Sequence, residues 1–258
     1  MDGEDRGAVH QRLRHEQIRQ FVEFGPSHLR ALPAGRAEDA GGGARATQSP
    51  KNSNVGRTHG QEKHARHDQG YIAAPVLGNP DFARARKLFV LAAGPPAAVD
   101  EVRPLLERLG QRLFVIGEDA ASANLVKLAA NVLTATTLEC MGEVLALMRK
   151  GGVDGHLAFD VLTNSLFDSR VHKSYGQKIV DGRYIPPGMT APLAIKDLRL
   201  ALAEAERAAV PMPAAALVHD RLVAMVARGW ADLDWSALGL LAAVDAGLDD
   251  GRSSHPST

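Results

Sequence analysis

The spacing of apolar residues along the chain changes sharply near residue 70. Between Leu32 and Tyr71 the only large aliphatic or aromatic residue is Val55. Such a segment has too little apolar surface to offset the conformational entropy that folding removes. We therefore predict that residues 1–70 are largely disordered, or are a segment foreign to the fold that follows.

From Tyr71 onward, short β-rich runs alternate with turn signals. Residues 71–76, 87–94 and 112–117 read as strands, and residues 97–110 carry the apolar periodicity of a helix ending at a glycine. The first strand is closed by the turn residues Gly-Asn-Pro at 78–80. Three short strands cannot form a covered sheet alone, so this part is predicted to be the edge of a larger α/β domain.

Beyond residue 117 the pattern is helical throughout, with proline and glycine between the segments. Asp154, which follows a double glycine, is expected to cap a helix N-terminus. We predict a helical domain over 119–247 and a flexible polar tail over 248–258. The expected helices cover residues 119–150, 154–166, 170–181, 191–209, 214–228 and 235–246.

Composition excludes several classes of function. The chain has 30 basic and 30 acidic residues, so no net field favours nucleic acid. It contains no apolar run of the roughly 18 residues that a membrane span needs. Six of the ten histidines fall in the first 70 residues without regular spacing, so no metal site is predicted. Cys140, the one cysteine, indicates a reducing compartment, hence the cytoplasm, and is expected in the core.

One lysine stands out within the longest predicted helix. From Ala120 to Leu138, Lys127 is the only charged residue, and a helix so apolar on nearly all sides is expected to be buried by its neighbours. Asn131 lies one turn further along the same face. This face could line a ligand-binding cleft, where burial would lower the lysine pKa. Alternatively, Lys127 reaches solvent at a domain edge.

Several motifs occur in an order that resembles a known family. They are APVLGNP at 74–80, VIGEDAASANLVKLAANVL at 115–133, MGEVLALMRKGGVD at 141–154, Lys196-Asp197-Leu198, and DLDWSAL at 232–238. Together they resemble the β-hydroxyacid dehydrogenases, which include the 3-hydroxyisobutyrate dehydrogenases. The resemblance implies that residues 71–118 are the remnant, or C-terminal part, of a Rossmann nucleotide-binding domain. It implies that 119–247 form an all-α domain like the C-terminal domain of 6-phosphogluconate dehydrogenase.

The same resemblance implies a function. Family members transfer hydride between NADP or NAD and a small hydroxyacid or carbonyl substrate, and their helical domains form homodimers. Lys127 would be the general acid/base, and Asn131 would orient the substrate. Both residues belong to the K-x-x-x-N pattern of the family's long helix.

The resemblance also implies binding residues. Backbone N–H groups around Leu77, Gly78 and Asn79 would hold the substrate carboxylate, and Lys196 would reach the cofactor or the substrate. From the residues alone, Gly78 could simply serve a turn, and Lys196 could lie on a solvated helix face.

Two features of the sequence depart from the family pattern. Leu77 and Asn79 stand where many members have a serine and a second glycine, so the serine hydroxyl is missing. The letters GGGARA at 41–46 imitate the dinucleotide fingerprint but lack the strand before it and the helix after it. We therefore expect impaired cofactor binding. The alternatives are a non-enzymatic helical dimerisation module or truncated pseudoenzyme, and a missing half supplied by another subunit.

Overall fold

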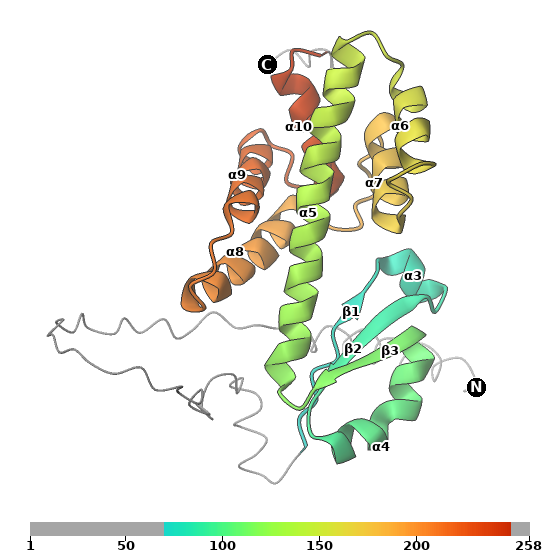
Figure 1. Ribbon diagram of the computed structural model, residues 1–258, viewed down its shortest axis with the longest axis vertical. Coiled ribbons are helices and arrows are strands. Elements are labelled where there is room, and N and C mark those ends of the chain that lie inside the picture. The colour runs from blue at the N-terminus through green and yellow to red at the C-terminus, as the bar shows by residue number, and fades with distance from the viewer. Residues whose placement is uncertain (1–69, 249–258) are drawn as a thin grey trace, which may run out of the picture.

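The computed structural model describes residues 70–248, which form a small α/β unit followed by a helical domain (Figure 1). This arrangement confirms the predicted fold class. The expectations for residues 1–69 and for the tail after residue 248 lie outside the described residues.

The α/β unit is built on a three-stranded sheet. Strands β1 (Val76–Leu77), β2 (Leu88–Ala93) and β3 (Gly110–Gly117) lie side by side in that order. β1 is antiparallel to β2, whereas β3 is parallel to β2. The parallel pair is joined through α4 (Pro96–Leu106) and the short 3-10 helix η1 (Glu107–Leu109), as a βαβ crossover requires.

The first predicted strand is shorter than expected. Over residues 71–76 the chain follows β2 as an irregular edge, where Ala73 exchanges two backbone hydrogen bonds with Ala93 and Leu91 donates to the carbonyl of Pro75. Pro75 has no N–H to donate, so the regular ladder is interrupted there and resumes only at β1.

A short helix occupies the place of the predicted turn. Helix α3 (Pro80–Arg84) begins directly after Asn79, whose side-chain oxygen accepts a hydrogen bond from the Phe82 N–H at 3.0 Å. Asparagine is a strong N-cap and proline is favoured at the first helical position. The Asn-Pro pair that favours a turn is therefore equally suited to begin a helix.

The predicted helices are confirmed within a few residues at their ends. Helix α5 (Ala120–Lys150) runs from the sheet along the whole helical domain, and the remaining helices pack on its two sides (Figure 1). Asp154 caps the next helix by accepting from the Leu157 N–H at 2.9 Å, as expected. The other elements are α6 (Gly155–Thr163), α7 (Arg170–Val180), α8 (Ala191–Arg207), α9 (Pro213–Ala227), η2 (Trp235–Ala237) and α10 (Leu238–Asp245).

The core of the helical domain lies between α5, α8, α9 and α10. Leu138, Leu198 and Leu222 are fully buried in it. Helices α5 and α10 cross closely, because a Cβ on Gly142 would lie only 2.6 Å from the Cα of Gly239. Glycine at this point allows the two backbones to touch, which fixes the position of α5.

Helix α5 is not buried on nearly all sides, contrary to the sequence-based expectation. One face carries an exposed apolar stripe, which we call the α5 stripe. Cys140, expected in the core, lies on it and is exposed. The apolar residues on this face of α5 are therefore not core residues. They form a surface that no other described part of the chain covers. The members of the stripe are Leu125, Ala129, Leu133, Cys140, Val144 and Leu147.

Candidate functional site

Lys127 joins the helical domain to the sheet. Its side-chain ammonium donates a hydrogen bond to the backbone carbonyl of Val76, at 2.8 Å, directly before the 77–79 segment. Burial lowers the pKa of Lys127, the nearby Asp197 carboxylate opposes this, and the ammonium of Lys196 adds to it. The lysine therefore does not reach into bulk solvent at a domain edge.

Asp197 connects Asn131 with Lys196. Its side chain is almost completely buried and accepts a hydrogen bond from the Asn131 amide at 2.6 Å. Its other oxygen lies 3.0 Å from the Lys196 ammonium. The sequence singled out Asp197 only as part of a motif. In the structure, Asp197 orients Asn131 and balances part of the positive charge around Lys127.

The 77–79 segment is shaped by its own side chains. Gly78 has a φ of +136°, and a Cβ there would lie 2.7 Å from the Leu88 side chain, so both backbone and space require glycine. Asn79 uses its carboxamide to cap α3. Leu77 is partly buried against the small core beside the sheet. This segment therefore offers a ligand its backbone rather than polar side chains.

A second lysine, which the sequence reasoning missed, lies beside this segment. The buried Asp234 accepts hydrogen bonds from the Lys178 ammonium at 2.8 Å and from the Gly188 N–H at 2.7 Å. Its other oxygen accepts from the backbone and the hydroxyl of Ser236. The position that a Cβ on Gly188 would take is 3.8 Å from the Cβ of Asn79 and 3.9 Å from the Lys178 nitrogen.

These residues form what we call the junction site, where the sheet and the helical domain meet. Its three lysines outnumber its two aspartates, so it carries a net positive charge that favours an anionic ligand. All six residues selected from the sequence belong to it. The junction site consists of Val76, Leu77, Gly78, Asn79, Lys127, Asn131, Lys178, Lys196, Asp197 and Asp234.

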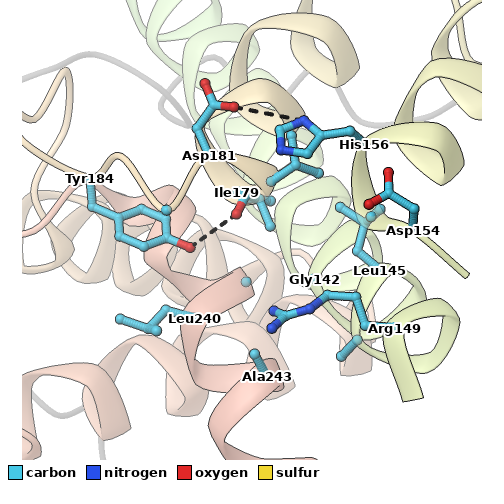
Figure 2. A pocket seen from close by; sticks show the side chains of 15 residues that line it. Gly142, Leu145, Arg149, Asp154, His156, Ile179, Asp181, Tyr184, Leu240 and Ala243 are labelled. Carbon is cyan, nitrogen blue, oxygen red and sulfur yellow. Dashed lines mark hydrogen bonds and ion pairs between the residues drawn. The ribbon is translucent and has the colours of Figure 1, made fainter. Parts of the chain in front are cut away.

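A separate cavity lies within the helical domain (Figure 2). It encloses about 370 Å³ between α5, α6, α7 and α10, and Arg149, His156, Asp181 and Tyr184 line it. Gly142, its lining residue nearest to Lys127 along α5, is separated from that lysine by about 22 Å of helix. This cavity is therefore not part of the junction site.

Two negative findings concern residues 70–248 only. They contain no helix long and apolar enough to cross a membrane. They also contain no cluster of three or more histidine, cysteine, aspartate or glutamate side chains suited to a metal ion.

Comparison with protein families identifies two adjoining matches. Residues 121–242 match the model described as the NAD-binding domain of NADP-dependent 3-hydroxyisobutyrate dehydrogenase. Residues 47–117 match the NAD-binding domain of 6-phosphogluconate dehydrogenase. The second match begins within the part of the chain that the structure does not describe.

Individual relatives agree with these matches. The chain is 37% identical to the Bacillus subtilis oxidoreductase YfjR, over 68% of this chain and 61% of the relative. It is 30% identical to the 2-hydroxy-3-oxopropionate reductase of Escherichia coli, over 65% of this chain and 57% of the relative. The match thus spans about three-fifths of the length of these relatives.

Solved structures show the same fold. The 3-hydroxyisobutyrate dehydrogenase of Salmonella typhimurium superposes with a TM-score of 0.64 at 24% identity, over 70% of this chain and 64% of that one. The Mycobacterium tuberculosis 3-hydroxyisobutyrate dehydrogenase gives 0.61 at 24% identity, over 70% and 65%. With the adjoining domain matches and the motif order around Lys127, these findings show that the chain belongs to the β-hydroxyacid dehydrogenase family of 3-hydroxyisobutyrate dehydrogenase-like, NAD(P)-dependent oxidoreductases.

Proposed function

We propose that the chain carries the proton-transfer and substrate-binding part of an NAD(P)-dependent oxidoreductase acting on a small hydroxyacid or the matching carbonyl compound. The observation that carries this proposal is the Lys127 ammonium, held 2.8 Å from the Val76 carbonyl beside the 77–79 segment. A lysine that burial makes more acidic, placed where two domains meet, suits a general acid/base.

In the reduction direction, a bound NAD(P)H would supply the hydride that the carbonyl carbon accepts. Protonated Lys127 donates its proton to the carbonyl oxygen, which becomes the hydroxyl. In the oxidation direction, neutral Lys127 removes the hydroxyl proton. Asn131 is fixed by Asp197 and orients the reacting oxygen through its remaining hydrogen-bonding capacity.

The described residues do not include a pyrophosphate site of the usual dinucleotide-binding kind. A pyrophosphate site needs a strand followed by a glycine-rich turn and a helix N-terminus. The strand-to-helix turns within residues 70–248 lack that fingerprint. We therefore propose that the chain binds NADPH and NADH weakly, so that turnover requires millimolar cofactor.

Titration calorimetry and a turnover assay test this function. NADPH should bind with a dissociation constant well above the micromolar range, and hydroxyacid or carbonyl turnover at millimolar NADP(H) should depend on Lys127. Micromolar NADPH affinity would contradict the proposed weakness of cofactor binding. Turnover that survives Lys127→Ala in the folded chain would contradict the proposed chemistry.

A homodimer through the helical domain is a second proposal, and the α5 stripe favours it. Leu133 and Leu147 on this face are 69% and 66% exposed. Apolar surface that runs along most of a helix marks an interaction face more often than a solvated one. We expect Leu133→Glu to shift the chain from dimer to monomer in light scattering, whereas Arg149→Gln, at an exposed position on the opposite side of the same helix, should not.

A further inference from the structure

Lys178 is positioned by contacts from elements far apart in the sequence. It lies in the last turn of α7, and its ammonium is held by Asp234, 56 residues further along the chain. Asp234 is 0% exposed and its carboxylate accepts four hydrogen bonds, so its charge is well satisfied without further partners. The carboxylate therefore acts as a fixed anchor for the lysine.

The Lys178 ammonium has hydrogen-bonding capacity left for a ligand. It carries three N–H donors, and Asp234 is its one hydrogen-bond acceptor among the described residues. Its side chain is 29% exposed, so the group is neither sealed in the core nor freely solvated. It also lies 5.5 Å from the centre of the Tyr175 ring, which limits its movement on that side.

Two lysines flank the 76–79 segment from the helical domain. Lys127 contacts its first residue, Val76, through the backbone carbonyl. Lys178 lies at its other end, because its nitrogen and the Cβ of Asn79 are both within 3.9 Å of the same point above Gly188. A small molecule bound along this segment would thus meet one ammonium at each end.

We infer that Lys178 binds the carboxylate of the substrate and so determines the preference of this chain for acids over neutral alcohols. The inference rests on the proposed function, in which Lys127 serves the reacting oxygen. It also accounts for the departure at Leu77, whose apolar side chain packs against the core beside the sheet and cannot supply a hydroxyl to the carboxylate. The ammonium of Lys178 supplies a charged donor instead.

An NMR titration tests this inference without requiring the cofactor. The full chain is titrated with 3-hydroxypropanoate and, separately, with its neutral methyl ester. The wild-type chain should bind the acid more tightly than the ester. Lys178→Met should reduce this preference by about ten- to a hundredfold, which is the usual worth of a charge-assisted hydrogen bond. Lys178→Arg keeps the charge and should retain most of the preference.

The matched control is Lys173→Met, on the same helix, where Lys173 pairs with Asp168 instead of Asp234. It should leave the preference unchanged. An equal loss of acid and ester binding in Lys178→Met would reveal a purely structural role and overturn the inference. So would a wild-type chain without any preference. Failure of the proposed function looks different, because the acid preference would persist while the wild-type chain shows no turnover with NADP(H).

Discussion

Replacing Lys127 by methionine should separate activity from stability. Burial lowers the pKa of Lys127 in the folded chain below its ordinary value of 10.5. For a base with a lowered folded-state pKa, the protonated form opposes folding. This penalty is fully present below the folded-state pKa and is relieved as the pH rises through that value towards 10.5. The free energy of unfolding of the wild-type chain should therefore increase over that interval.

The expected magnitudes follow from the contacts of the side chain. Lys127→Met removes the hydrogen bond to the Val76 carbonyl, worth about 1.5–3 kcal/mol for a charged donor. It also removes the cost of burying the ammonium and places an apolar chain of similar length in a partly buried position. These effects oppose each other, so the variant should be as stable as the wild type within about 1 kcal/mol at neutral pH. Loss of a general acid should lower turnover by about 10²- to 10⁴-fold.

Urea unfolding at neutral and alkaline pH, combined with turnover at millimolar NADPH, measures both quantities. The stability of Lys127→Met should lack the rise with pH that the wild type shows. Lys150→Met, at the exposed end of the same helix, should change neither quantity appreciably. The roles assigned to Lys127 are refuted if Lys127→Met keeps turnover within about tenfold of the wild type, or loses more than about 3 kcal/mol of stability at neutral pH.

Three further substitutions test the surroundings of the site. Asn131→Leu leaves a buried oxygen of Asp197 without its donor. The free energy of unfolding in urea should fall by about 1–3 kcal/mol, and turnover should fall as well. An unchanged free energy of unfolding would contradict the hydrogen bond between Asn131 and Asp197. Gly142→Ala should destabilise the chain by about 1–3 kcal/mol in thermal unfolding because its Cβ meets the backbone of α10, whereas Gly155→Ala, where a Cβ meets only the Arg149 side chain at 3.6 Å, should not. Arg221→Met leaves the buried Glu139 carboxylate, whose pKa burial already raises, without its partner at 2.6 Å. The loss should be about 3–5 kcal/mol at neutral pH and should shrink as the pH falls and Glu139 protonates, so a loss independent of pH would exclude this cause.

Local signals in the sequence predicted most of the helical domain. Apolar periodicity and glycine or proline punctuation place the helices, because both depend on neighbours within a few residues. Lys127 and Asn131 could be identified because their signal is also local: a single charged residue within an apolar helix can be recognised from the sequence alone. The structure places Lys127 against Val76 and Asn131 against Asp197, and the roles of the two residues stay a prediction.

Features that depend on distant contacts could not be found in this way. Lys178 is one of eight lysines in the sequence, and only its contact with Asp234 makes it distinctive. The α5 stripe was misjudged because an apolar helix surface gives no sign of whether its own chain or another one covers it. The short helix α3 was missed because asparagine and proline favour both a turn and a helix start.

In the proposed reaction, Lys127 is the group that gives its proton to the reacting oxygen. The most direct test is the pH dependence of kcat/KM for carbonyl reduction in the wild type and in Lys127→Met at saturating NADPH. We predict that wild-type kcat/KM declines as the pH rises through a pKa below the ordinary lysine value of 10.5, and that the residual activity of the variant lacks this decline. The same alkaline decline in both proteins would assign the proton to another group and contradict the account.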